Sequence, residues 1–321
     1  MIKKFTLARD LINNAQNILL ATHCQPDADA LGSMLALKMG LETLNKNTQV
    51  FCLPEVPESL RFLPHQEHTK AHFSLEDIHL IIGLDYGSHE RLGLGPLEVL
   101  SQFNFLTIDH HLVGNHLGHC IVESNFSSTS ELVYEFLKFL EIPIDNKMAT
   151  CLLAGILDDT GGLKYPSTTH QTLKTVAALM RQGAPLAKIS RFLSASNLIE
   201  DIGVWQETFD NLSIDQEIGL IFSFIGHERF AELGPKFKAS IIAETLIATP
   251  EIKFALMMIE KTPGQIDCSL RSTKEKDINV AKIAGAFGGG GHYLAAGFLS
   301  QKRPPEIVDQ IKSFLLSKTA Y

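Results

Sequence analysis

Short apolar runs alternate with amphipathic segments through the first half of the chain. Runs such as NILLATH at 17–23 and HLIIGLD at 79–85 are apolar at nearly every position, which is typical of strands buried on both faces of a parallel sheet. The segment at 30–45 has apolar positions at helical spacing instead, as a core-facing helix does. The pattern therefore predicts βαβ units, with strands at 17–23, 48–53, 79–85 and 104–109 and helices at 30–45, 127–142 and 147–157.

The second half begins with an amphipathic helical stretch, 185–212, that contains no strand pattern. Strand patterns then interleave with helical patterns, the strands at 217–225, 252–261 and 265–272 and the helices at 236–248, 279–287 and 304–318. A short turn between 262 and 265 joins two of these strands as a hairpin, which makes the second sheet mixed. We therefore predict an α/β fold with a parallel Rossmann-like sheet flanked by helices over 1–184, a helical connector over 185–212, and a second, smaller mixed-sheet α/β domain over 213–321.

Aspartate and histidine residues gather at or just beyond the ends of the apolar runs. In an open α/β sheet the loops beyond the carboxyl ends of parallel strands share one edge, so residues far apart in sequence can converge there. One such residue is more often a capping or packing residue than a ligand, but a coincidence over several segments is much harder to explain in that way. The residues concerned are His23, Asp27, Asp29, Asp85, Asp109, His110, His111 and Asp159.

The mixture of carboxylates and imidazoles indicates a metal site. Aspartate and histidine together suit a divalent transition ion such as Mn²⁺, whereas an all-oxygen set would suit Mg²⁺ or Ca²⁺ and thiolates would suit Zn²⁺. The five aspartates carry a formal charge of −5, so one divalent cation would leave the site too negative for a phosphate, and two would nearly neutralise it. Two ions roughly 3.5–4 Å apart can hold a hydroxide and clamp the attacking and leaving oxygens of a phosphoryl group. The sequence therefore predicts two Mn²⁺ ions per active site and hydrolysis of a phosphoester.

The second half supplies residues suited to binding phosphates. The run FGGGGH at 287–292 places four glycines before a histidine, where backbone without side chains can approach a ligand and expose N–H donors. The run matches neither a dinucleotide-binding fingerprint nor a P-loop, and taken alone a flexible loop explains it equally well. Arg271, at the end of an expected strand, offers a planar guanidinium that fits a second phosphate.

Composition narrows the class of protein and of substrate. The chain has 321 residues, 45% of them hydrophobic, which suggests about two domains with ample core. Its net charge of −8 argues against a surface that follows long duplex nucleic acid, but it allows a local basic pocket for a short anionic substrate. Five scattered cysteines without a CxxC pair, no leader-like N-terminus and no apolar stretch of membrane-spanning length predict a cytoplasmic protein without a membrane partner.

The order and spacing of these motifs resemble those of the DHH phosphoesterase family with its DHH-associated C-terminal domain. The resemblance rests on HCQPDADALGS, LDYGS, the DHH triplet at 109–111, GILDDTG and GGGGH, which together span almost the whole chain. The length and the glycine-rich tail are similar to the short branch of bifunctional oligoribonucleases and pAp phosphatases rather than to the longer RecJ exonucleases. This resemblance implies a phosphoric ester hydrolase acting on short RNA oligonucleotides (nanoRNA) and on the nucleotide bisphosphate 3′-phosphoadenosine 5′-phosphate (pAp). The resemblance is also compatible with a homodimer.

The resemblance also implies roles for individual residues. One ion would be held by His23, Asp27 and Asp85, and the other by Asp29, Asp85, His110 and Asp159, with Asp85 bridging. The catalytic residues outside the ligand set would be Asp109, His111 and His292, with His111 close to the scissile phosphate. Substrate phosphates would be bound by Arg271, Gly289, Gly290, Gly291 and His292. Asp158 stands where the family motif usually has a non-acidic residue, so either Asp158 or Asp159 could be the ligand.

Several alternatives compete with this interpretation. The nearest is hydrolysis of cyclic dinucleotides or of their linear products pApA and pGpG. An inorganic pyrophosphatase would share the first motifs but not FGGGGH, and a non-catalytic nucleotide-binding regulator would be expected to lack one or more ligands. A partial zinc site is suggested by His116, His119 and Cys120, but no second ligand pair is present, so we expect a solvated loop there.

Overall fold

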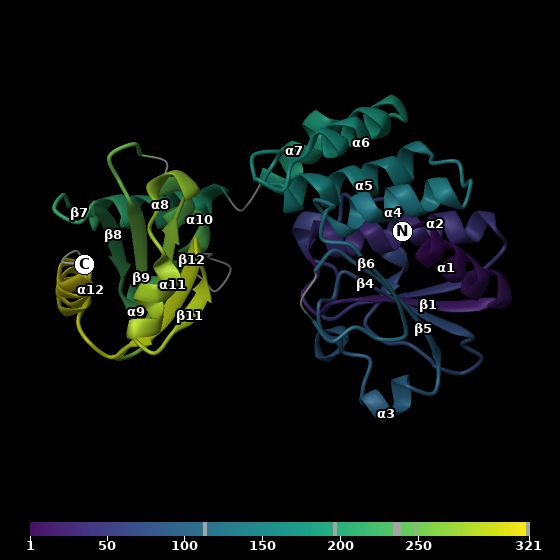
Figure 1. The fold of residues 1–321 in the computed structure, drawn as a ribbon, viewed down its shortest axis with the longest axis horizontal. Helices are drawn as coiled ribbons and strands as arrows, with labels where there is room; N and C mark the ends of the chain where they lie inside the picture. Colours follow the sequence, from purple (N-terminus) through teal and green to yellow (C-terminus); the bar gives the residue numbers. More distant parts are fainter. Residues whose placement is uncertain (112–113, 195–197, 234–238, 248, 319–321) are drawn as a thin grey trace. The chain divides into compact units, whose positions relative to one another are not determined.

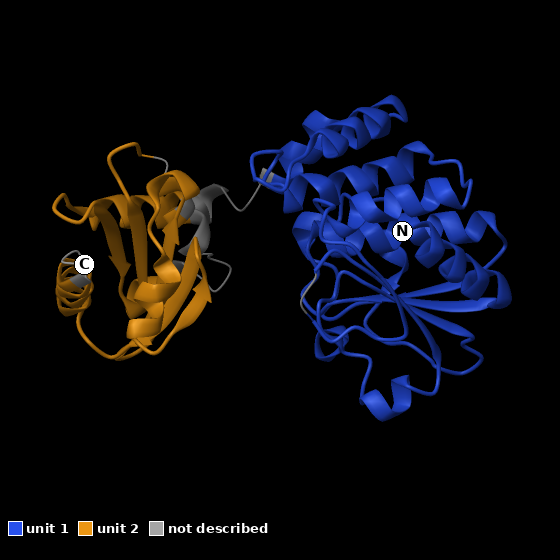
Figure 2. Ribbon diagram, in the orientation of Figure 1, with its two compact units in different colours: residues 1–196 blue, residues 197–321 orange. Residues whose placement is uncertain are grey.

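A computed structural model describes residues 1–111, 114–194, 198–233, 239–247 and 249–318. The chain forms two compact units, Met1–Ser196 and Asn197–Tyr321, which Figures 1 and 2 show. Within the segment expected to be a connector, α7 (Leu186–Ser194) packs on α5 (Asn146–Asp159) of the first unit, and α8 (Leu198–Asp210) packs on β8 (Leu220–Ile225) of the second. Residues 195–197 of that segment, and the start of the helix expected at 236–248, lie outside the described residues. None of the described helices is long and apolar enough to cross a membrane.

The first unit contains a six-stranded sheet in which every strand is parallel to its neighbours. The strand order β3-β2-β1-β4-β5-β6 is that of a doubly wound Rossmann sheet, so the predicted fold is confirmed. All four predicted strands are present with ends shifted by at most two residues, whereas β3 and β6 were not predicted. The strands are β1 (Asn17–Thr22), β2 (Asn47–Phe51), β3 (Thr69–Lys70), β4 (Leu80–Leu84), β5 (Asn104–Asp109) and β6 (His119–Val122).

Successive side chains of β1 enter two different cores, one on each face of the sheet. Ile18 and Leu20 lie in the larger core, and Leu19 and Ala21 lie in a smaller core on the opposite face. Figure 1 shows helices stacked over one face, where α1, α2 and α4 contact the strands and α5 packs on α2 and α4. The remaining helical segments of this unit are α1 (Ile2–Asn14), α2 (Ala28–Thr43), α3 (Leu97–Leu100), α4 (Thr129–Phe139), α6 (His170–Arg181), and the 3₁₀ turns η1 (Glu58–Leu60), η2 (Gln66–His68) and η3 (His89–Leu92).

Close packing of α2 against α5 brings the end of α5 to the start of α2. A Cβ at Gly32 of α2 would lie 2.4 Å from the carbonyl oxygen of Cys151, so only glycine allows this approach. The start of α2 is capped by Asp27, whose carboxylate accepts hydrogen bonds from the amides of Asp29 and Ala30. The end of α5 therefore delivers its last residues to the carboxyl edge of β1.

The second unit is built around a mixed sheet, as predicted, but the sheet has six strands, of which β7, β11 and β12 were not predicted. Its order is β11-β12-β10-β9-β8-β7, with β8 parallel to β9 and the other neighbours antiparallel. The predicted hairpin joins β9 to β10 through Gly264, whose φ of +76° suits a tight turn. The other elements are β7 (Ser213–Asp215), β9 (Phe254–Thr262), β10 (Gln265–Ser272), β11 (Gly290–His292), β12 (Ala295–Ser300), α9 (His227–Leu233), α10 (Ala239–Leu246), η4 (Lys274–Lys276), α11 (Val280–Ala286) and α12 (Pro304–Lys318).

Candidate active site

Asp85 lies at the carboxyl edge of the parallel sheet, directly after β4. Its backbone has a φ of +52°, a left-handed conformation that aspartate adopts more readily than most residues. The carboxylate is buried, with Oδ2 3.9 Å from Nε2 of His23 and Oδ1 3.7 Å from Nε2 of His110. The two oxygens of one carboxylate therefore face two different histidines.

His23, Asp27 and Asp85 form a first cluster, with potential ligand atoms all within 4.8 Å of one another, and Asp85 also groups at this spacing with His110 and His111. Nδ1 of His23 lies 2.9 Å from the carbonyl oxygen of Cys24. Because a carbonyl can only accept, Nδ1 carries the hydrogen and Nε2 presents its lone pair to the cluster. Asp27 divides its oxygens in a similar way: Oδ1 caps α2, and Oδ2 lies 3.6 Å from Nε2 of His23.

Asp29, His110 and Asp159 form the second cluster, also within 4.8 Å. Nε2 of His110 lies 3.0 Å from Oδ2 of Asp159, but this buried nitrogen has no hydrogen-bond partner of acceptable geometry. Asp29 is fully buried, and both of its oxygens accept backbone hydrogen bonds from the start of α4, from the amides of Thr129 and Ser130. The helix end stabilises this carboxylate and fixes its position.

The start of α4 is a part of the site that the sequence did not reveal. The run Ser128–Glu131 was expected only to begin a helix, and Ser128 does cap α4 by accepting from the amide of Glu131. The same turn also supplies the amides that bind Asp29, and Thr129 donates its hydroxyl to Oδ1 of Asp85 at 2.9 Å. Gly155 of α5 faces this turn, and a Cβ there would lie 2.1 Å from Oγ of Ser130 and 2.6 Å from Oδ1 of Asp29.

Asp109 lies behind the clusters and links two segments of the site. Its Oδ2 accepts from the amides of Tyr86 and Gly87, and its Oδ1 accepts from the amide and from Nδ1 of His111, the latter at 2.8 Å. Burial alone would raise the pKa of Asp109, but the hydrogen bonds from His111 and Gly87 lower it to about 2. Asp109 is therefore ionised, and it holds His111 with Nδ1 protonated and Nε2 free.

Burial and mutual repulsion dominate the electrostatics of the two clusters. Burial, followed by repulsion from Asp159, raises the pKa of Asp29 well above its ordinary value, and burial followed by repulsion from Asp29 does the same for Asp85. Burial alone would lower the pKa of His110, but Asp159 and Asp29 raise it to about 9. The carboxylates thus outweigh the positive charge around them, an imbalance that a bound divalent cation would relieve.

The neighbouring aspartates Asp158 and Asp159 point to different partners. Asp159 belongs to the second cluster, whereas Oδ2 of Asp158 accepts a hydrogen bond from the amide of Ala28 at 3.0 Å. Asp158 thus contributes to the cap of α2, and Asp159 has the position expected of a ligand.

The expectation of a solvated loop at His116, His119 and Cys120 was wrong. His119 and Cys120 lie in β6, and Nε2 of His119 donates to the carbonyl oxygen of Lys4 at 2.8 Å. His116 packs edge-on against Tyr86, with a nearly buried side chain and Nε2 3.5 Å from Oδ2 of Asp109. A polar edge strand lacks the continuous apolar pattern of the inner strands, which is why β6 was missed.

In the second unit, Arg271 and His292 lie in one row of the sheet. Arg271 of β10 and His292 of β11 both pair with Ala295 of β12, which lies between them. Residues opposite one another on adjacent strands project to the same face, so both side chains belong to one face, roughly 10 Å apart across two strand spacings.

The glycine run is partly strand rather than loop. Gly290 and Gly291 belong to the short edge strand β11, where they pair with Gly297 and Ala296. A Cβ at Gly289 would lie 2.1 Å from the carbonyl oxygen of Gly297, and at Gly291 one would lie 2.5 Å from that of Ala295. Close backbone packing therefore requires Gly289 and Gly291 whether or not they contact a ligand, whereas a Cβ at Gly290 would meet nothing within 4 Å. His292 is exposed at the end of the strand.

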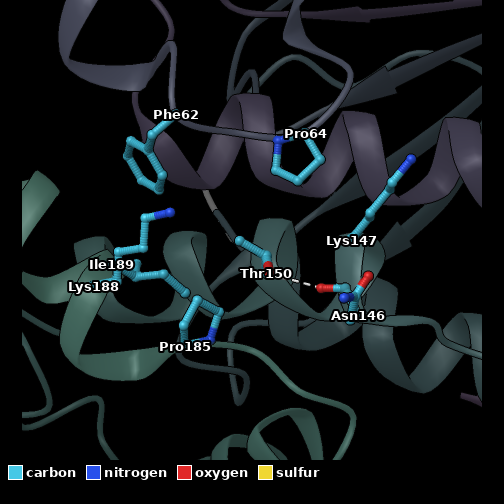
Figure 3. A pocket seen from close by; sticks show the side chains of 8 residues that line it. All are labelled: Phe62, Pro64, Asn146, Lys147, Thr150, Pro185, Lys188 and Ile189. Carbon is cyan, nitrogen blue, oxygen red and sulfur yellow. Dashed lines mark hydrogen bonds between the residues drawn. The ribbon is translucent and has the colours of Figure 1, made fainter.

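The cavity in Figure 3 is separate from the metal-ligand candidates. It has a volume of about 190 Å³, and the side chains of Lys147 and Lys188 lie on opposite sides of it. Lys147 is in the first turn of α5 and Asp159 is its last residue, so about 18 Å of helix separates them. His65, Glu67 and His68 form a further, mostly exposed cluster near this cavity, but the ammonium of Lys147 lies 3.4 Å from Nε2 of His65 and would oppose a cation there.

Known families and curated proteins match most of the chain. Residues 17–156 match the DHH family, N-terminal domain, and residues 228–317 match the DHHA1 domain. The chain is 25% identical over 324 residues to the bifunctional oligoribonuclease and PAP phosphatase NrnA of Thermus thermophilus, across 92% of this chain and 88% of that protein. It is 28% identical over 294 residues to the protein of the same name from Bacillus subtilis, across 87% of this chain and 88% of the relative.

Solved structures share the fold. An exopolyphosphatase-related protein from Bacteroides fragilis superposes with a TM-score of 0.85 at 22% identity, covering 99% of this chain and 96% of the other. Exonuclease RecJ bound to manganese superposes with a TM-score of 0.53 at 15% identity, covering 97% and 93%. With both of its characteristic domains matched in order along the sequence, the chain belongs to the DHH family of phosphoesterases.

Proposed function

We propose that the carboxyl edge of the parallel sheet binds two divalent ions and hydrolyses phosphoesters of short nucleotides. One ion would be held by His23, Asp27 and Asp85, and the other by Asp29, Asp85, His110 and Asp159. The position of Asp85 is the observation that supports this most directly, because each of its oxygens faces one of the two clusters.

The chemistry of the donor atoms fits this proposal. Nε2 of His110 is buried 3.0 Å from Oδ2 of Asp159 and makes no hydrogen bond of acceptable geometry with the described residues. Nε2 of His23 presents a lone pair beside two carboxylates, as metal-binding imidazoles do. Each cluster has both nitrogen and oxygen donors and no sulfur, which favours Mn²⁺ over Mg²⁺, since Mg²⁺ prefers oxygen ligands. A related fold, that of RecJ, has been solved with manganese bound.

The proposed substrates are nanoRNA and pAp. The names of the relatives from Thermus thermophilus and Bacillus subtilis, which the chain matches over most of its length, support this choice. The row formed by Arg271 and His292 supports it as well, since a cationic residue and an imidazole on one sheet face suit phosphate groups. Such substrates would place the protein in the cytoplasm.

The chain's own residues would orient the substrate and transfer protons. When bound, the ions would polarise the phosphoryl group and lower the pKa of a water molecule. Asp109 holds His111 with Nε2 free, so His111 can exchange a proton there beside the phosphate. His292 and Arg271, with Gly289, Gly290 and Gly291 giving the backbone room, would bind the phosphates from the second unit.

The roles of Asp158 and Asp159 can be separated by substitution. We expect Asp159→Ala to lower kcat by about a hundredfold or more, because it removes a ligand of the second ion. Asp158→Ala should leave kcat within a few-fold and cost about 1 kcal/mol of stability, because it removes an acceptor at the start of α2. Steady-state kinetics and thermal unfolding of both variants test this. A larger loss of kcat in Asp158→Ala would reverse the assignment.

Arg271→Ala should weaken binding of substrates that carry a second phosphate. Losing a charge-assisted hydrogen bond of this kind corresponds to about 1.5–3 kcal/mol, or a tenfold to hundredfold lower kcat/KM, mostly through KM. Metal content should stay that of the wild type, because the candidate ligands all lie in the first unit. Arg303→Ala is a matched control, since Arg303 is an exposed arginine of the same unit. Unchanged kinetics of Arg271→Ala on pAp and on dinucleotides would remove Arg271 from the proposed site.

A single substrate panel tests the proposed function as a whole. Purified protein with Mn²⁺ is assayed against pAp, an RNA ladder, pGpG, a cyclic dinucleotide and pyrophosphate. We expect AMP from pAp and mononucleotides from the shortest RNAs, with rates falling as the RNA lengthens. Preferred turnover of the dinucleotides would favour the signalling-nucleotide alternative, and turnover of pyrophosphate alone would indicate a pyrophosphatase.

A further inference from the structure

Arg91 lies in a short segment that joins two loops of the candidate active site. The segment begins with Asp85 and continues into η3, which contains Arg91. The carbonyl oxygen of Arg91 accepts a hydrogen bond from the amide of Cys24, next to His23, at 2.6 Å. Its guanidinium lies 3.4 Å from the carbonyl oxygen of Tyr86, next to Asp85. Arg91 therefore contacts two residues that are each next to a proposed metal ligand: Cys24 follows His23, and Tyr86 follows Asp85.

The backbone that carries Arg91 is held from several sides. Asp109 binds the amides of Tyr86 and Gly87, and the amide of His89 donates to the carbonyl oxygen of Asn115 at 3.2 Å. Gly87 has a φ of +64°, and a Cβ there would meet only Nη1 of Arg91, at 3.6 Å. A guanidinium on such a fixed turn loses less entropy on binding a ligand than one on a mobile loop.

Arg91 lies at an edge of the sheet that is rich in carboxylates, but it forms no ion pair with any carboxylate of the described residues. In an acid-rich edge a cation would be expected to pair with a carboxylate, yet across the described residues no carboxylate oxygen lies within 4 Å of this exposed guanidinium. The neighbouring Glu90 instead accepts from Ser88 and lies 3.6 Å from Nδ1 of His89. The only hydrogen bond recorded for the side chain within the described ranges is the long one to Tyr86. Most of its N–H donors therefore face solvent at the edge of the site.

We infer that Arg91 is a substrate-binding residue of the first unit that holds a phosphate oxygen of the nucleotide being hydrolysed. A planar guanidinium can bind two oxygens of one phosphate, and its permanent positive charge cannot serve as a metal ligand. Lys164, on the turn after Asp159, is the competing cation, but it is a point charge on a flexible stem. The inference rests on the proposed function and adds to it a phosphate contact on the same unit as the metal ligands.

Binding and turnover of pAp test this inference separately. Five chains are compared: the wild type, Arg91→Ala, Arg91→Lys, Lys164→Ala and, as a control at an exposed arginine of α6, Arg181→Ala. The Kd for pAp is measured by calorimetry with a divalent ion that gives no turnover in the wild type, and kcat and KM are measured with Mn²⁺. Metal content and thermal unfolding are recorded for each chain.

We expect Arg91→Ala to raise Kd and KM about tenfold to hundredfold with unchanged metal content and unfolding temperature. The Kd and KM of Arg91→Lys should lie between those of Arg91→Ala and the wild type, because lysine keeps the positive charge but lacks the planar guanidinium that can bind two phosphate oxygens. Equal Kd values for the wild type and Arg91→Ala, or a loss confined to Lys164→Ala, would overturn the inference while leaving the proposed function intact. A wild type that binds pAp through Arg91 without hydrolysing it would contradict only the function. A wild type that neither binds nor hydrolyses pAp would contradict both.

Discussion

Removing divalent cations with excess EDTA should abolish hydrolysis and leave the chain folded. The candidate ligands crowd buried carboxylates together, and without a cation they have no charge that stabilises a phosphoryl transition state. The hydrophobic core of the first unit is extensive and does not depend on these side chains, so circular dichroism should change little. Activity against pAp, measured after desalting, should fall below about 1% of the starting value, a loss of roughly 3 kcal/mol or more in transition-state stabilisation.

Adding Mn²⁺ back should restore more activity than adding Mg²⁺, because two imidazoles belong to the proposed ligand set. The affinity for Mn²⁺ should rise between pH 7 and pH 9. The pKa of His110 is raised to about 9 without a metal, so below that pH the ion has to displace a proton from it. Full activity in excess EDTA, or better recovery with Mg²⁺, would contradict the proposed metal centre.

Asp85→Asn should be the most damaging single substitution among the proposed ligands. Asparagine keeps the size of the side chain and an acceptor for the hydroxyl of Thr129, but it removes the negative charge that lies between His23 of the first cluster and His110 of the second. We expect kcat/KM to fall about a thousandfold, which corresponds to about 4 kcal/mol, and the bound metal to fall below that of a variant lacking a ligand to one ion. Kinetics and metal analysis of Asp85→Asn and Asp159→Ala side by side give the comparison.

Asp77→Asn is a matched control for this substitution. Asp77 is exposed and has a φ of +59°, so the control makes the same chemical change on a similar left-handed backbone. It precedes β4, whereas Asp85 follows that strand. In EDTA at pH 7, Asp85→Asn should unfold at a temperature no lower than that of the wild type. A carboxyl whose pKa is raised by burial destabilises the folded chain when ionised, and this penalty fades as the pH falls through the raised pKa. Near wild-type turnover of Asp85→Asn would show that Asp85 does not bridge two ions.

The continuous apolar runs were enough to predict the inner strands of the first sheet. A strand such as β4 is buried on both faces, so its sequence is apolar throughout and its ends are marked by polar residues. The same rule explains what was missed. The edge strands β3, β6 and β7 are short or polar, and β11 contains two glycines, so none of them has a pattern that differs from that of a loop. The inner strand β12 was missed as well, because its sequence AAGFLS lacks the β-branched residues that are typical of a strand.

The residues of the candidate site were identifiable because ligand chemistry selects Asp and His at strand ends. Their neighbours could not be found in this way. Thr129 and Ser130 act mainly through backbone amides, which every residue except proline possesses, and so their identity carries little information. His116 reaches Asp109 only because the chain folds back beside Tyr86, a contact that no local spacing encodes. Such support is visible only in three dimensions.

Gly155 has a practical consequence for anyone who engineers this protein. Exchanging a helical glycine for alanine is a common route to higher stability, worth about 1 kcal/mol in an exposed helix, and a design based on helix propensity would select Gly155 of α5. Here the added methyl group would press on the carboxylate of Asp29 and on the hydroxyl of Ser130. A library designed on helix propensity alone would therefore enrich a change that damages the active site, and position 155 should be held fixed in any thermostabilisation campaign.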